Sequence, residues 1–69
     1  MPAEMTVLRQ LVRLRHRRKM GQSDVARKMG VTRQQIYNIE TGRQGYANIR
    51  TVERYAKAVG AKVVVVQRG

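Results

Sequence analysis

Apolar residues recur at helical spacing along most of the chain, and short polar or glycine-containing breaks separate one recurrence from the next. Between Thr6 and Arg18 they gather on one broad helical face, which consists of Val7, Leu8, Leu11, Val12 and Leu14. Polar residues, mostly arginine, occupy the opposite face, as in an amphipathic helix of a globular protein. The pattern predicts a first helix over about residues 6–18, followed by a break at Lys19-Met20-Gly21.

Capping signals bound a second, short helix over residues 22–29. Gly21 is a suitable N-cap, and Asp24 then falls in the first turn, where a carboxylate interacts favourably with the helix dipole. Gly30 follows the last apolar residue at the place where a left-handed residue stops a helix. The inner face of this helix is expected to comprise Val25, Ala26 and Met29.

Two further helices follow, separated by a loop that contains two glycines. Thr32 and Gln35 have the spacing of a capping box, in which each side chain bonds the other residue's backbone N–H. They predict a third helix over about residues 32–41. Asn48 is a favoured N-cap and predicts a fourth helix over about residues 48–59.

The last apolar segment contains four consecutive valines and predicts a β-strand over residues 62–67. A lone strand leaves its backbone N–H and C=O groups unpaired, so we expect antiparallel pairing with the same segment of a second copy. Pairing within one chain is the alternative. The expected dimer interface is Val63, Val64, Val65 and Val66. The expected fold class is mostly α, with four helices and this short strand in one domain over residues 1–69.

The charge of the chain narrows the choice of partner. Among 69 residues, Lys and Arg number 15 and Asp and Glu 4, which gives a net charge of +11. Such an excess indicates a polyanionic partner, and the many arginines suit phosphates and guanine edges. The longest apolar run, Val63–Val66, is too short to span a membrane, and the N-terminus lacks the pattern of a secretory signal. We expect a cytoplasmic protein with no membrane partner.

Catalysis is not expected from these residues. His16 is the only histidine and lies in a basic run, and the four acids, Glu4, Asp24, Glu40 and Glu53, are scattered. No nucleophile has an adjacent base at helical spacing, and no glycine-rich phosphate loop is present. The chain has no cysteine, which excludes disulfides and thiolate metal sites. We expect no enzyme activity, no cofactor and no metal.

Residues 22–41 show the pattern of a helix, a tight turn and a second helix. Ala26 must be small because the second helix crosses close above it, and Gly30 must adopt the left-handed turn. Ile36 and Ile39 supply the apolar side that holds the pair on the rest of the core. This is the helix-turn-helix arrangement, whose second helix enters the DNA major groove.

Residues 6–60 resemble the Cro/cI-type, or XRE-type, helix-turn-helix domain of bacterial and phage repressors. The resemblance rests on Leu14-Arg15, on Gln22 through Ile36, and on Asn38 through Arg43. The typical domain has five helices, whereas four are expected here and the chain ends in Val63–Val66. That ending is similar to the short C-terminal strand of HipB-type antitoxins and of Cro, which serves dimerisation.

The resemblance implies roles for individual residues. The outward positions of the family's second helix, which meet base edges or nearby phosphates, correspond here to Thr32, Arg33, Gln34, Tyr37 and Asn38. The positions that touch the DNA backbone correspond to Gln22, Arg43, Tyr46 and Asn48. A partly buried ion pair of the family corresponds to Arg15 and Glu40.

The residue types agree with these roles, because Gln and Asn can bond adenine bidentately, Arg can bond guanine, and helix starts offer free N–H groups to phosphate. The alternative is that these side chains are solvated helix surface, or, for the tyrosines, packing residues. The expected function is a sequence-specific repressor that binds a palindromic operator in double-stranded DNA as a homodimer, with half-sites about 34 Å apart.

Three other functions remain as alternatives. An antitoxin would bind DNA in the same way and also neutralise a protein toxin, and the strand ending favours it. A membrane-active or nonspecific basic protein would need only an amphipathic basic helix, a character that the first helix alone has. RNA binding would require exposed stacking aromatics on a sheet, for which the sequence offers no candidates.

Overall fold

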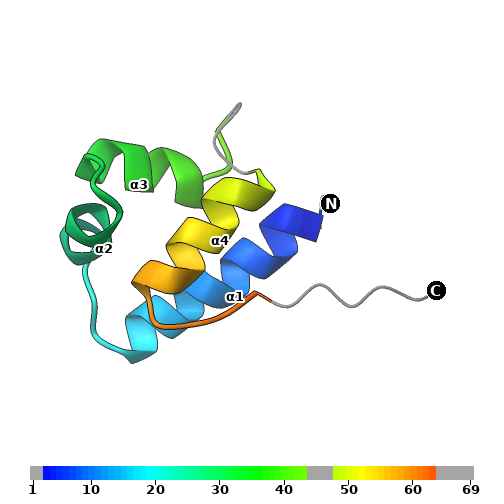
Figure 1. Cartoon of the computed structure of the whole chain (residues 1–69), viewed down its shortest axis with the longest axis horizontal. Coiled ribbons are helices and arrows are strands. Elements are labelled where there is room, and N and C mark those ends of the chain that lie inside the picture. The colour runs from blue at the N-terminus through cyan, green and yellow to red at the C-terminus, as the bar shows by residue number, and fades with distance from the viewer. Residues whose placement is uncertain (1–2, 44–47, 64–69) are drawn as a thin grey trace.

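The computed structural model describes residues 3–43 and 48–63, with the backbone alone at positions 3 and 4. Four helices run in the order α1 (Ala3–Arg17), α2 (Gln22–Met29), α3 (Arg33–Glu40) and α4 (Ile49–Ala58) (Figure 1). The described part contains no strand, and Lys62 and Val63 adopt no regular structure. The rest of the expected strand and dimer interface, at positions 64–67, lies outside the described residues.

The predicted caps are confirmed at each of the last three helices. The Asp24 carboxylate accepts from the Gly21 N–H at 2.7 Å, and the Thr32 hydroxyl accepts from the Gln35 N–H at 3.1 Å. Gly30 has φ +69°, the left-handed conformation expected where α2 ends. The Asn48 Oδ1 accepts from the backbone N–H of the third residue of α4 at 3.0 Å. These local bonds determine where each helix begins.

The first helix begins three residues earlier than the apolar pattern predicts, at Ala3 instead of Thr6. The additional residues include Ala, Glu and Met, all strong helix formers. Met5 also packs against the core, so this turn has a tertiary contact that stabilises it.

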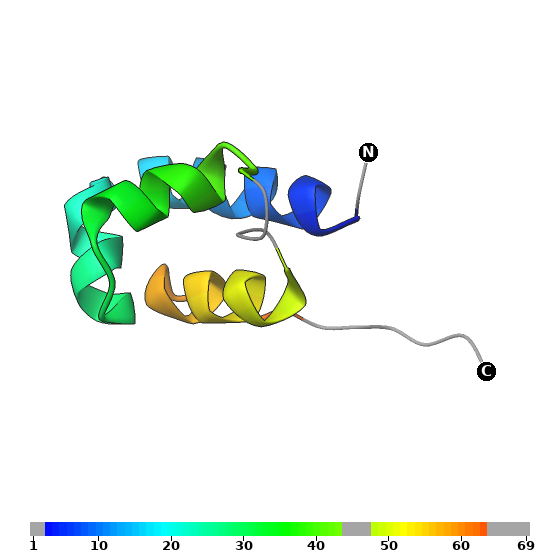
Figure 2. The same cartoon turned by 90° about the horizontal axis from the view of Figure 1, so that it is seen from above.

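The core is one aliphatic cluster into which a single tyrosine is inserted. α2 packs against both α3 and α4, and α4 packs against α1. Figure 2 shows α3 along one side of the molecule and α4 along the other, with α2 lying across one end. The largest fully buried side chains among the described residues are Leu8, Val25, Ile36, Val52, Tyr55 and Val59.

The end of α4 is tied to the end of α1 by an arginine. The Arg18 Nη1 donates to the carbonyl oxygens of Val59 at 2.7 Å and Gly60 at 3.3 Å. Gly60 has φ +81°, and a Cβ at this position would lie 2.2 Å from the Arg18 Nη1. The left-handed glycine therefore permits both the end of α4 and the close approach of Arg18.

Candidate nucleic-acid interface

The outward face of α3 is polar and accessible over its whole length. Arg33, Gln34 and Tyr37 are exposed, with Tyr37 keeping 45% of its surface, and Asn38 is half-buried. On the opposite face Ile36 and Ile39 are buried in the core. The helix therefore presents hydrogen-bonding side chains on a rigid, anchored backbone.

Two amides on this face bond one another. The Gln34 Nε2 donates to the Asn38 Oδ1 at 3.2 Å, the (i, i+4) spacing at which helix side chains meet. This bond leaves the Gln34 Oε1 as an acceptor and the Asn38 amide as a donor. The pair thus offers a hydrogen-bond acceptor and a hydrogen-bond donor in neighbouring positions.

The base-facing role implied for Thr32 is constrained by its cap. The Thr32 hydroxyl accepts from the Gln35 N–H and also lies 3.3 Å from the Gln35 Oε1, to which it donates. The side chain is exposed, but both its donor and an acceptor position are already used within the capping box. Thr32 therefore has less hydrogen-bonding capacity left than Gln34 has.

A recess of about 210 Å³ lies where the start of α2 meets α3. Its lining consists of Gln22, Arg33, Gln34 and Tyr37. Four residues that the resemblance assigned to DNA contact are thus brought together by the fold, although Gln22 comes from a different helix. The recess is polar, and one cationic side chain, that of Arg33, lines it. It is open to solvent.

Gln22 also links this recess to a buried ion pair between Arg15 and Glu40. The Arg15 Nε donates to the Glu40 Oε2 at 2.9 Å, and the Arg15 Nη2 donates to the Glu40 Oε1 at 3.1 Å. The two side chains keep only 8% and 10% of their surface. The geometry is the bidentate fork that makes arginine–carboxylate pairs strong and directional.

The remaining donors of Arg15 are also satisfied. Its Nη1 donates to the Met20 carbonyl oxygen at 2.9 Å, and its Nη2 lies 3.0 Å from the His16 Nε2. Arginine has no acceptor, so the exposed His16 ring accepts here through Nε2. The pair therefore joins α1, the turn after it, and the last residue of α3.

Two further residues that the sequence analysis did not assign to the ion pair complete the network. The Tyr55 hydroxyl donates to the Glu40 Oε2 at 2.5 Å and lies 3.1 Å from the Arg15 Nε. The Gln22 Nε2 donates to the Glu40 Oε1 at 3.0 Å. A tyrosine on the buried face of an otherwise aliphatic helix was the available signal, since a buried hydroxyl needs a partner. For Gln22 the sequence carried no such signal.

Burial and neighbouring groups shift two pKa values in this network. Burial raises the pKa of Tyr55 well above its usual range, and the hydrogen bond to Glu40 adds to the effect. Burial alone would lower the pKa of Arg15, but its bonds to Glu40 and Tyr55 outweigh this and raise the pKa above its ordinary value. Both groups therefore hold their protons more tightly in the folded chain.

The Tyr55 shift predicts a loss of stability at alkaline pH. The unfolded chain releases the Tyr55 proton near the ordinary pKa of 10.0, whereas the folded chain retains it. The stabilisation is therefore complete below this pH and declines above it, by up to about 1.4 kcal/mol per pH unit.

Urea unfolding of the wild type from about pH 9 to about pH 11 measures this decline in the free energy of unfolding. The Tyr55→Phe variant removes the titrating group, so its free energy of unfolding should decline less steeply with pH. Equal slopes would contradict the shift.

The residues expected at the DNA backbone lie around the end of α3 and the start of α4. Arg43 is exposed, and its backbone N–H donates to the Asn38 carbonyl oxygen at 3.0 Å. Asn48 is exposed as well, but its Oδ1 is used as the cap of α4. Tyr46 lies outside the described residues.

Comparison with known families now identifies the class of protein. A family model described as a helix-turn-helix domain matches residues 7–68. The chain belongs to this family, and α2 and α3 are its helix-turn-helix pair, which makes the protein a DNA-binding domain of the regulator type. No curated protein and no solved structure matched the chain. Among the described residues, no helix is both long enough and apolar enough to cross a membrane.

Proposed function

We propose that the protein is a sequence-specific transcriptional repressor that binds a palindromic operator. The observation that carries this proposal is the exposed polar face of α3, held on the core by Ile36 and Ile39. A recognition helix needs outward side chains that can bond base edges and a backbone that does not move beneath them. The net charge of +11 supplies the attraction to phosphate.

Base readout is assigned to the outward residues of α3. Gln34 and Asn38 provide amides that match adenine, and the Arg33 guanidinium matches guanine or a phosphate. Tyr37 is exposed and offers its ring edge and hydroxyl beside them. Thr32 is exposed and adds its methyl group, because its hydroxyl is used by the cap.

Backbone contact is assigned to residues that flank this helix. Gln22 opens α2 beside the recess, and its bond to Glu40 fixes the orientation of its amide. Arg43 follows α3, and Asn48 opens α4, where unpaired helix N–H groups favour phosphate. Tyr46 belongs to the same proposal by resemblance alone.

A palindromic operator requires a two-fold symmetric protein. We assign the dimer contact to Val63, Val64, Val65 and Val66, because a strand of valines satisfies its backbone by pairing with a second copy. A sedimentation mass that stays at 7.9 kDa for the full chain would contradict the dimer. The antitoxin alternative depends on the same segment, and no described residue favours it.

Base-reading and phosphate-binding residues should respond differently to alanine. Gln34→Ala and Asn38→Ala should each weaken operator binding by about 1–3 kcal/mol and relax sequence preference at one base pair. Arg43→Ala should weaken binding to every sequence alike and reduce the salt slope by about one unit per protomer. The measurement is the affinity for a duplex selected from random pools and for a random duplex, across a salt series.

The ratio of the two affinities decides the outcome. It should shrink for the two amide variants with little change in salt slope, and stay constant for Arg43→Ala. Gln10→Ala, an exposed and uncharged position on α1, is the control that should change neither quantity. A wild-type protein that binds every duplex equally would overturn sequence-specific recognition.

A further inference from the structure

A second basic surface lies on α4, away from the face of α3. Arg50, Arg54 and Lys57 are exposed and follow one another at the (i, i+4, i+7) spacing, which aligns them along one side of the helix. At 1.5 Å per residue the row is roughly 10 Å long. Lys28, exposed in the last turn of α2, extends it. These four residues are called the basic row below.

Two shallow, open recesses adjoin the basic row. A recess of about 670 Å³ is lined by α4 and its cap, and an adjoining one of about 390 Å³ runs on to α2. Both recesses contain Arg54 and Lys57, and the second contains Lys28. A polyanion lying in them would therefore meet cations from two helices.

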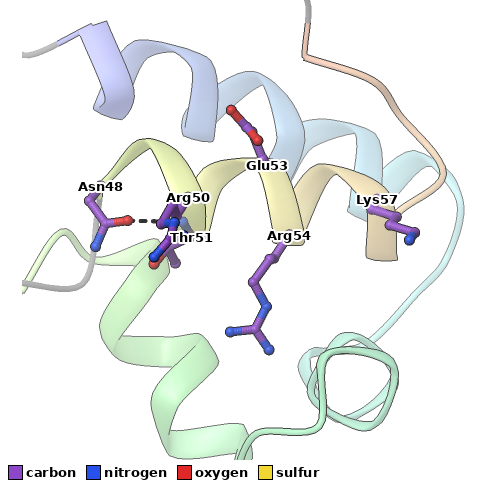
Figure 3. Close-up of a pocket in the computed structure, with 6 residues that line it drawn as sticks. All are labelled: Asn48, Arg50, Thr51, Glu53, Arg54 and Lys57. Carbon is purple, nitrogen blue, oxygen red and sulfur yellow. Dashed lines mark hydrogen bonds between the residues drawn. The ribbon is translucent and has the colours of Figure 1, made fainter.

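One member of the basic row is held in position. The Arg54 Nη2 donates to the Met29 carbonyl oxygen at 2.8 Å, at the C-terminal end of α2. Figure 3 shows Arg54 extending from α4 toward α2, with Glu53 pointing to the other side of the helix. The guanidinium keeps its remaining N–H groups for a ligand, and an ordered side chain loses less entropy on binding than a free one.

The basic row carries an uncompensated charge. It comprises four cations, and one acid, Glu53, lies at the edge of the larger recess, so the surface keeps a positive excess. The ion pairs in the described part of the chain are Arg15–Glu40 and Arg27–Asp24, so neither involves the basic row. Like charges held together on a small domain cost stability unless a partner neutralises them.

The composition of this surface indicates nucleic acid rather than protein. The lining of the larger recess is Asn48, Arg50, Thr51, Glu53, Arg54 and Lys57, with no large apolar side chain. Cores of protein–protein interfaces are apolar or aromatic and depleted in lysine, whereas DNA-binding surfaces are polar and strongly positive. The planar arginine fork also matches phosphate oxygens.

We infer that the basic row binds the phosphate backbone of a second DNA duplex while α3 holds the operator. Figure 2 places α3 and α4 along different sides of the molecule, and the row lies on the outward side of α4. The operator contacts proposed above, Gln22 and Asn48, lie at the starts of α2 and α4, whereas Lys28 and Lys57 lie in the last turns of these helices. The protein would therefore join two DNA segments, one read by sequence and one held by charge. This inference goes beyond the proposed function and uses it only for the first duplex.

The test measures capture of a second duplex. A duplex selected for tight binding is immobilised and saturated with the full-length chain, and a labelled random duplex is then added across a salt series. The wild type should capture the labelled duplex, with a steep loss of capture as salt rises. In the Arg50→Gln/Lys57→Gln variant, capture should weaken at least about tenfold, while loading on the immobilised duplex stays within about twofold. Arg54 is left in place because it bonds the Met29 carbonyl.

A matched control separates location from total charge. Arg9→Gln/Arg13→Gln also removes two exposed cations, but from α1. It should retain capture within about twofold of the wild type, because the basic row is intact. Equal loss of capture in both variants would overturn the inference, since net charge alone would then explain it.

Three other outcomes would also overturn it. The Arg50→Gln/Lys57→Gln variant could capture the second duplex as well as the wild type does. It could instead lose loading on the immobilised duplex, which would place the basic row on the operator itself. Labelled polyglutamate could be captured in place of the random duplex, which would assign the row to an acidic protein. Failure of the proposed function is distinct, because it would show as equal loading on selected and random duplexes.

Discussion

Replacement of Glu40 by alanine is expected to lower the free energy of unfolding by about 3–5 kcal/mol, because it leaves the Arg15 guanidinium buried without its counter-charge. The Tyr55 hydroxyl and the Gln22 amide lose a partner at the same time. A chain of this length has a total stability of roughly 3–10 kcal/mol. We expect the variant to be largely unfolded at ordinary temperature, as measured by circular dichroism and urea titration.

Controls separate the ion pair from the loss of a surface charge. Glu53→Ala removes an exposed acid from α4 and should change stability by no more than about 0.5 kcal/mol. The double variant Arg15→Met/Glu40→Leu should be far milder than Glu40→Ala, because no charge remains buried. Equal losses in the single and double variants would contradict the pairing.

The structure refines this test through Tyr55. The double variant leaves the Tyr55 hydroxyl without either of its partners, and a buried unsatisfied hydroxyl costs about 1–3 kcal/mol. Adding Tyr55→Phe should recover part of the stability that the double variant loses. A triple variant less stable than the double would show that the hydroxyl finds another partner.

Replacement of Ile36 by alanine is expected to cost about 2–5 kcal/mol, since the side chain is 0% exposed beneath α3 and its truncation leaves a cavity. The cavity would lie under the helix that carries the proposed base-facing residues, so a fraction of the protein should be unfolded in the absence of DNA. Apparent affinity for DNA should fall, and saturating DNA should raise the urea midpoint again.

Gln34→Ala on the same helix should do the opposite of Ile36→Ala: it should alter DNA binding without altering stability. Its side chain is exposed, so its stability should stay within about 0.5 kcal/mol of the wild type while operator preference falls. The conservative change Ile36→Val should cost only about 0.5–1.5 kcal/mol. An Ile36→Ala protein as stable as Gln34→Ala would show that Ile36 does not anchor the helix.

Much of the fold follows from local signals in the sequence. The Gly21–Asp24 and Thr32–Gln35 caps and the left-handed Gly30 mark the bounds of α2 and the start of α3, because each acts within a few residues. The start of α1 was less predictable, since Met5 is stabilised by packing against residues distant in sequence. Apolar periodicity alone does not reveal such a contact.

The sequence predicts which residues form the site but not the hydrogen bonds that join them across different helices. The outward residues of α3 follow from helical period, and the structure leaves Arg33, Gln34 and Tyr37 exposed. The hydrogen bond from Gln22 to Glu40, by contrast, joins the first residue of α2 to the last residue of α3. No spacing rule predicts which polar residues meet across a fold, so only three-dimensional packing could reveal it.

The separation of roles along α3 has an evolutionary consequence. The side chains that hold the helix, Ile36 and Ile39, are buried, whereas Arg33, Gln34 and Tyr37 make no contribution to the core. Mutations at the outward positions are therefore expected to be nearly neutral for folding, and, under the proposed function, selection can act on operator preference alone. After gene duplication, two copies could diverge to different operators through a few such substitutions, and a library randomised at these positions should consist mostly of folded proteins.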